Sequence, residues 1–113
     1  MLAGVVDLAL GNFHSILVKQ DGSVWCSGLN SNGQLGITLA ITFSKRFVQV
    51  IASEALAAAA GFGHSMVLTQ DGNVWVTGQN SKGQLGDGSK ASTGTFLYVQ
   101  ITGTANMVYF TVN

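Results

Sequence analysis

The sequence predicts an all-β protein built from tandem repeats, and three observations lead to that class. Residues 11–36 and 61–86 are two copies of one stretch, aligned without a gap at an offset of fifty residues and with fifteen identical pairs. Each copy holds short apolar runs of strand length. Each copy also places Asp-Gly, a tight-turn signal, between two such runs. A self-similar period of this length is typical of a solenoid or a propeller.

The strands of the first copy follow from its sequence in order. Residues 5–10 form an alternating-to-apolar run that predicts a strand leading into Gly-x-x-His. His-Ser and the apolar residues 16–18 predict the next strand, and Gln-Asp-Gly predicts a hairpin turn. Val-Trp-Cys-Ser-Gly, residues 24–28, is the returning strand, since it is rich in β-branched and aromatic types. The same elements are expected fifty residues later.

One segment presents a conflict between propensity and position. Residues 53–60 read Ser-Glu-Ala-Leu-Ala-Ala-Ala-Ala, which by propensity alone favours a helix. The run is too short to be stable as an isolated helix, and its register matches the strand that precedes Gly11. We therefore expect residues 55–60 to form a strand whose small side chains suit a crowded position.

The segments outside the two copies complete the repeats. Residues 37–51 are expected to hold the outer strands of the first unit, and residues 98–101 echo residues 47–51. Residues 103–113 align with the start of the second copy, with Asn106 at the histidine position. These alignments predict one region over 1–113: a first repeat at about 5–54, a second at about 55–102 and a partial third at 103–113.

The repeated residues are expected to be structural, as turn formers, loop anchors and core residues. They are Gly11, His14, Asp21, Gly22, Trp25, Gly28, Asn30, Gly33, Gln34, Leu35 and Gly36, with Gly61, His64, Asp71, Gly72, Trp75, Gly78, Asn80, Gly83, Gln84, Leu85 and Gly86.

The pattern G-x-x-H-S…D-G-x-V-W-x-x-G-x-N-S-x-G-Q-L-G closely resembles the repeat of the regulator of chromosome condensation family. The resemblance implies a seven-bladed β-propeller with one four-stranded blade per repeat. This chain would then form two antiparallel blades of such a ring, a partial propeller. Family repeats commonly place a proline early in the segment equivalent to 37–51, and this chain has no proline, so the loop geometry there is open.

Composition indicates that the two blades lack partners. Charged residues are 9% of the chain and hydrophobic residues 47%, whereas about 25% charged residues is usual. We interpret the deficit as faces meant for further blades, either in a larger propeller of which this is a fragment or through self-association. The formal net charge is zero, and the basic face that binding to DNA phosphates would need is missing.

No catalytic, cofactor or metal site is expected. The lone Cys26 excludes an intramolecular disulfide and favours an inert buried thiol. His14 and His64 lack nearby carboxylates or thiols in the sequence, so a ring nitrogen bonded to a backbone group is favoured over a metal ligand. Asp21 and Asp71 precede turn glycines, and Trp25 and Trp75 are expected in core packing.

The favoured function is a non-enzymatic protein-interaction module, with a protein partner that the sequence does not name. The alternative, which the resemblance implies, is guanine-nucleotide exchange on a small GTPase. Exchange in the family uses one propeller face and an insertion between strands, and neither copy contains an insertion. The N-terminal stretch lacks a basic region and carries Asp7, so no secretory signal is predicted. With the single cysteine, this favours an intracellular protein, and no membrane span is expected.

Overall fold

The computed structural model describes residues 4–79 and 93–99, and every regular element in those ranges is a β-strand. The strands are β1 (Val5–Leu10), β2 (His14–Lys19), β3 (Val24–Leu29), β4 (Phe43–Ile51), β5 (Ala55–Ala60), β6 (His64–Thr69), β7 (Val74–Gly78) and β8 (Thr93–Val99). They form two four-stranded antiparallel sheets in the orders β1-β2-β3-β4 and β5-β6-β7-β8. The all-β prediction and its antiparallel blades are confirmed.

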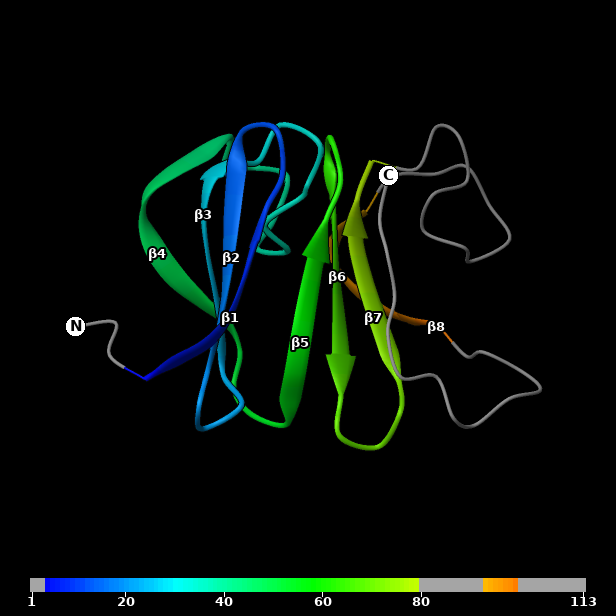
Figure 1. Cartoon of the computed structure of the whole chain (residues 1–113). Coiled ribbons are helices and arrows are strands. Elements are labelled where there is room, and N and C mark those ends of the chain that lie inside the picture. The colour runs from blue at the N-terminus through cyan, green and yellow to red at the C-terminus, as the bar shows by residue number, and fades with distance from the viewer. Residues whose placement is uncertain (1–3, 80–92, 100–113) are drawn as a thin grey trace.

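The two sheets stand side by side, with β5 packed against β1 and β2 (Figure 1). Each sheet is a simple meander, because consecutive strands are neighbours and pair antiparallel. The Gly-x-x-His loops lie at the upper end of the blades in Figure 1, and the Asp-Gly turns lie at the lower end.

The strand pairing of the first sheet recurs in the second sheet fifty residues later, at the same offset as the sequence repeat. His14 faces Gly28 and Leu17 faces Trp25 across β2 and β3, and their counterparts across β6 and β7 pair in the same way. Even the register shift near the start of the first strand recurs, between Val5 and Asp7 in one blade and Ala55 and Ala57 in the other. The duplication in sequence is therefore a duplication of the blade.

The alanine-rich segment forms strand β5 as expected from its register, despite its helical propensity. Ala58 and Ala60 pack against the core between the blades, where larger side chains would need more room. Tertiary packing has overridden local propensity here, as it commonly does.

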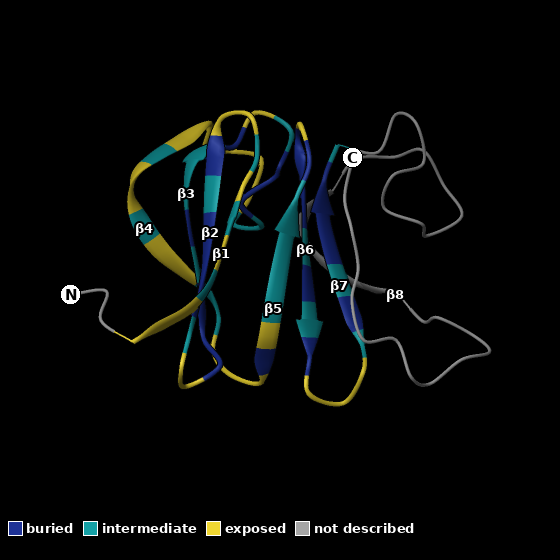
Figure 2. Ribbon diagram, viewed as in Figure 1, coloured by how far each residue is buried: buried dark blue, intermediate teal, exposed yellow. Residues whose placement is uncertain are grey.

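The main core lies between the two sheets and draws on both repeats (Figure 2). It consists of Ile16, Val18, Val24, Cys26, Leu35, Ala55 and Val67, all less than one tenth exposed. A second, smaller cluster of Val74 and Val76, with Met66 and Leu68 against it, lies on the opposite face of the second sheet. Each blade thus carries an apolar layer on the face that points toward the C-terminal side: the layer of the first blade is covered by the second blade, and the second blade has an equivalent layer.

The opposite face of the first blade is open. Leu8 and Leu10 are 54% and 65% exposed, whereas their repeat equivalents Ala58 and Ala60 pack against the core between the blades. Val6 on the same strand is also exposed. On the first blade, large apolar side chains are therefore exposed to solvent at the positions whose equivalents on the second blade pack against the first.

Some predicted features lie outside the described residues. These are the partial third repeat at 103–113 and the second-copy loop positions Asn80, Gly83, Gln84, Leu85 and Gly86. Within residues 4–79 and 93–99, no helix has the length and apolar character needed to cross a membrane.

Candidate interaction surfaces

The Gly-x-x-His segment is a compact loop in which the histidine folds back over the glycine. Gly11 N–H donates to the His14 carbonyl at 2.9 Å, and Gly61 does the same with His64 at 3.0 Å. A Cβ on Gly11 would overlap the imidazole of His14, and one on Gly61 would overlap the imidazole of His64. This close approach explains why both copies begin with glycine.

His14 joins the two blades through a hydroxyl. Its Nε2 lies 2.9 Å from Ser65 Oγ, and that hydroxyl donates to the Gln34 carbonyl at 2.6 Å. Because Ser65 has one hydroxyl proton, its oxygen must accept from His14, which places the proton on Nε2. The expected backbone partner is replaced by a serine of the other repeat, which in turn holds a backbone carbonyl.

Burial controls the charge of the histidines. Desolvation lowers the pKa of His14 from 6.5 to about 4, and it also lowers the pKa of His64. His14 is therefore neutral at pH 7, consistent with its role as a single donor. Among the described residues, no group of three or more His, Cys, Asp or Glu side chains is placed to hold a metal ion.

A second hydroxyl strengthens the same contact between blades. Thr77 is fully buried, and its Oγ1 donates to the Gly33 carbonyl at 2.8 Å. Together, Ser65 and Thr77 hold the consecutive carbonyls of Gly33 and Gln34. The Gly-Gln-Leu part of the motif is thus the strip of backbone by which the first blade binds the second.

Asn30 organises the long loop between β3 and β4. Its Nδ2 donates at 2.7 Å to the carbonyls of both Thr38 and Ile41, and its Oδ1 accepts from Leu35 N–H at 2.9 Å. This fully buried amide therefore fixes both ends of the loop and inserts Leu35 into the core. This segment contains no proline, and the hydrogen bonds of Asn30 hold its loop in place.

The two Asp-Gly turns have different supporting hydrogen bonds. Asp21 accepts from the hydroxyl and the backbone N–H of Ser23, and these bonds lower the pKa of its carboxyl. Asp71 accepts from the Thr69 hydroxyl at 2.6 Å and from Asn73, and the Thr69 bond is the main reason why its pKa is lowered. Both aspartates are turn residues, as the sequence indicates.

Trp25 and Trp75 occupy the same strand position but meet different surroundings. Trp25 donates its indole N–H to Ser23 Oγ at 2.9 Å, and Lys19 Nζ lies 5.4 Å from the centre of its ring. Trp75 packs against the core between the blades. Both are half-buried, and the expected core packing is found for Trp75, whereas Trp25 is not among the side chains that pack against either core cluster.

Cys26 is fully buried in the core. Burial raises the pKa of its thiol to about 12. The thiol stays protonated at neutral pH, which makes it a poor nucleophile.

An aromatic pair stands on the surface where the two Gly-x-x-His loops meet. The rings of Phe13 and Phe62 are 6.4 Å apart at 78°, an edge-to-face contact, and the side chains are 63% and 57% exposed. One residue comes from each repeat. Paired aromatic rings on rigid loops are typical anchors of protein interfaces.

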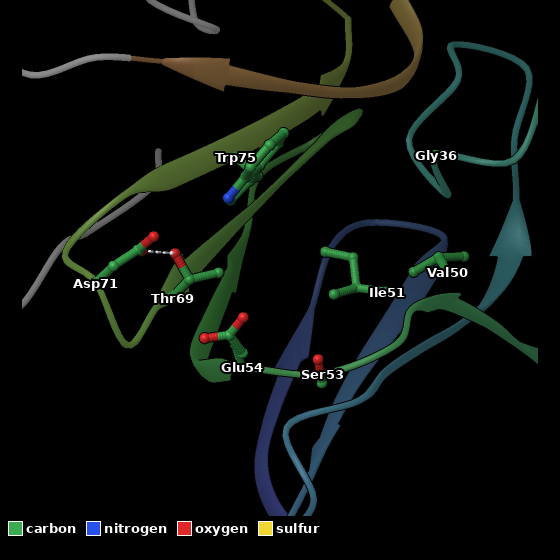
Figure 3. A pocket seen from close by; sticks show the side chains of 8 residues that line it. All are labelled: Gly36, Val50, Ile51, Ser53, Glu54, Thr69, Asp71 and Trp75. Atoms are coloured by element: carbon green, nitrogen blue, oxygen red, sulfur yellow. Dashed lines mark hydrogen bonds between the residues drawn. The ribbon is translucent and has the colours of Figure 1, made fainter.

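A pocket of about 410 Å³ lies between the blades near the Asp-Gly turns (Figure 3). The segment from Val50 to Glu54 forms one wall, and Thr69, Asp71 and Trp75 of the second blade form the other. In Figure 3 the Trp75 indole and the Asp71 carboxylate are on the same side of the opening, with Glu54 and Ser53 across from them.

The model of the regulator of chromosome condensation (RCC1) repeat matches residues 5–34 and 57–84, more than half of the chain. The chain belongs to the RCC1 repeat family. The first match begins in β1 and includes β2 and β3, and the second begins in β5 and includes β6 and β7.

Solved RCC1-type structures share the fold. Human WBSCR16 superposes with a TM-score of 0.75 and 26% identity over 85% of this chain. Yeast RCC1 (Prp20), solved bound to Kap60, gives a TM-score of 0.81 at 19% identity over 90% of this chain. Prp20p from Saccharomyces cerevisiae gives 0.73 at 21% identity over 87%. The chain spans about a quarter of each of these proteins.

One curated protein shares a shorter segment. Ras guanine nucleotide exchange factor C of Dictyostelium discoideum is 53% identical over 32 residues, which are 28% of this chain and 2% of that protein. The shared segment is about as long as one of the two repeat matches.

Sequence reasoning identified the repeat positions but missed three features of the surface. Asp7 Oδ2 accepts from Ala58 N–H at 2.9 Å and so joins β1 to β5. The aromatic pair was missed because Phe13 and Phe62 fall at different positions of the motif. One difference between the copies could have indicated the pocket: the first copy has Lys19 where the second has Thr69.

Proposed function

We infer that this chain is a non-enzymatic module of RCC1-type repeats that binds a protein partner through its loops. The supporting observation is the exposed pair of Phe13 and Phe62, which is held on two loops that His14, Ser65 and the glycines make rigid. Exposed aromatic residues in fixed positions bury much area on binding with little loss of side-chain freedom. The repeated polar residues form hydrogen bonds to backbone groups and to the neighbouring blade, and so they stabilise the scaffold.

A cross-linking comparison tests this function. The wild-type chain, the double variant Phe13→Ala/Phe62→Ala and the control Phe43→Ala would each carry a photoreactive label and be exposed to extract of the host cells. Phe43 is also exposed but lies on the outer strand β4. Partners cross-linked by the wild type and the control should be lost from the double variant. An identical set of cross-linked proteins from all three would contradict the proposal.

Guanine-nucleotide exchange on a small GTPase is the second candidate. Its support is the segment shared with a Ras guanine nucleotide exchange factor and the fold shared with Prp20p, whose structure was reported with its binding to Gsp1p and histones. Exchange in the family uses a propeller face and an insertion between strands, and residues 11–36 and 61–86 contain no insertion. We expect unchanged release of fluorescent nucleotide from a small GTPase when the chain is added. Accelerated release would favour exchange instead.

A further inference from the structure

The loop that follows β3 contains an Asn-Gly pair, Asn32 and Gly33. In such a pair the backbone nitrogen after the asparagine is unusually accessible, because glycine has no Cβ to shield it. Asparagine side chains also interact readily with backbone groups close by in the chain. The second copy has Lys82 and Gly83 at the same places, so this chemistry is available to the first copy only.

The reaction open to this pair is cyclisation followed by hydrolysis. The Gly33 backbone nitrogen loses its proton to a solvent base and attacks Cγ of Asn32, so that an N–Cγ bond forms, the Cγ–Nδ2 bond breaks and ammonia leaves. Water then opens the succinimide ring. Cleavage between the nitrogen and Cγ gives aspartate, and cleavage between the nitrogen and the main-chain carbonyl carbon gives isoaspartate. Water is the only co-reactant, and no oxidation or reduction takes place.

In the folded chain, hydrogen bonds hold the reacting groups in place. Gly33 N–H donates to the Asn30 carbonyl at 3.0 Å, and Asn32 N–H donates to Gln34 Oε1 at 2.8 Å. The Gly33 carbonyl accepts from the Thr77 hydroxyl at 2.8 Å. Cyclisation requires a released Gly33 nitrogen and rotation of the Asn32 backbone and side chain, and these bonds oppose both.

The second blade provides the restraints on the carbonyl side of the loop. Thr77 and Ser65 are both fully buried, and their hydroxyls donate to the consecutive carbonyls of Gly33 and Gln34. The loop can therefore leave this conformation only when the contact between the blades opens locally. Local openings of this kind occur in native proteins at a lower free energy than global unfolding.

We propose that Asn32 is a deamidation site whose rate of reaction is controlled by the contact between the two blades. The closed contact protects the Asn-Gly pair, and each local opening exposes the pair to reaction. This inference does not depend on the function proposed above.

The product would alter the place where the two blades meet beside Phe62. A Cβ on Gly63 would lie 2.9 Å from Nδ2 of Asn32, so the Asn32 amide packs directly against Gly63. Deamidation replaces this neutral amide with a carboxylate, and isoaspartate also lengthens the main chain. The reaction is irreversible, so openings of the contact leave a lasting chemical mark in the loop.

Incubation at neutral pH, followed by peptide mapping with enzymatic detection of isoaspartate, measures the rate at Asn32. The wild-type chain would be compared with Thr77→Val, with Ser65→Ala and with a synthetic peptide of residues 28–38. The folded wild type should react at least about tenfold more slowly than the peptide. Each variant should react at least about fivefold faster than the wild type, because a bond that keeps the contact closed is lost.

Two further variants serve as controls. Asn32→Lys copies the second repeat and should give no isoaspartate at this position, which assigns the signal. Gly72→Ala strains the second Asp-Gly turn, at the other end of the blades, and should leave the rate within about twofold of the wild type because the contact with the loop stays closed.

Three results would overturn the proposal. One is a folded wild type that reacts as fast as the peptide, and another is a wild-type rate in both Thr77→Val and Ser65→Ala. The third is an acceleration by Gly72→Ala as large as that by Thr77→Val, because the rate would then follow overall stability and not the contact between the blades.

Discussion

Single side chains decide how one blade recognises the next, and the Ser65 hydroxyl is the clearest case. It accepts from His14 and donates to the Gln34 carbonyl, so one buried oxygen satisfies two polar groups of the first blade. Leaving a buried donor or acceptor unsatisfied costs about 1–3 kcal/mol. The Ser65 hydroxyl therefore contributes more to the free energy of unfolding than a single hydrogen bond would.

The repeat provides a matched test of that hydroxyl. Ser65→Ala should lower the free energy of unfolding by about 2–4 kcal/mol, because both His14 Nε2–H and the Gln34 carbonyl lose their partner. Ser15→Ala changes the equivalent residue of the first blade, which is half-exposed, and should change stability by less than about 0.5 kcal/mol. Urea unfolding measures both. Equal losses in the two variants would contradict the role given to Ser65.

Stability should also depend on pH through His14. The unfolded chain protonates this residue near pH 6.5 and the folded chain only near pH 4, so the unfolded state binds more protons in that window. Stability is then fully present above pH 6.5 and falls as the pH is lowered, by about 1–3 kcal/mol at pH 4. His64 adds a change of the same sign, whereas Asp21 and Asp71 act only at lower pH.

Denaturant unfolding at several pH values between 7 and 4 measures this slope. His14→Gln should make the slope shallower and leave the part due to His64. A free energy of unfolding that stays constant over this range in the wild type would show that His14 is not desolvated as described.

At the scale of the element, the two hairpin turns are alike in conformation and differ in surroundings. Gly22 and Gly72 both have a φ of 83°. A Cβ on Gly22 would overlap the backbone nitrogen of Glu54, whereas a Cβ on Gly72 would meet no atom of the described residues within 4 Å. The first turn is therefore in contact with the linker to the second blade, and the second turn has no such contact with residues 4–79 or 93–99.

Alanine at each glycine separates backbone strain from crowding. Gly72→Ala should cost about 1 kcal/mol, the strain of a positive φ. Gly22→Ala should cost about 1–3 kcal/mol more, because the linker at Glu54 must move. The difference between the two free energies of unfolding is the quantity to compare. If it is zero, the contact between the first turn and the linker contributes nothing.

The strands and turns were predictable from sequence because their signals are local. Residues 5–10 and 55–60 form strands with the expected bounds, the latter because its register outweighed the helical propensity of its alanines. The pocket and the partner of His14 were not predictable. Both depend on packing between residues about 15 to 50 positions apart, such as Ile51 with Thr69 and His14 with Ser65. A repeat pattern reports what the copies share, whereas the pocket arises where they differ.

At the scale of the whole molecule, the chain is two adjacent blades that satisfy one shared interface. The equivalents of Ser65 and Thr77 in the first blade are Ser15 and Ser27, which are only half-buried, and Leu8 and Leu10 beside them are exposed. These are the residues that a preceding blade would cover, since Ser65, Thr77, Ala58 and Ala60 are covered in that way. In repeat proteins such faces are stabilised by neighbours.

Sedimentation velocity of the 113-residue chain over a range of concentrations tests this account most directly. It predicts species larger than the 11.7 kDa chain whose proportion rises with concentration, and a smaller proportion in the variant Leu8→Glu, which places a charge on the open face. A single 11.7 kDa monomer at every concentration would contradict the claim that the blades need neighbours on their outer faces.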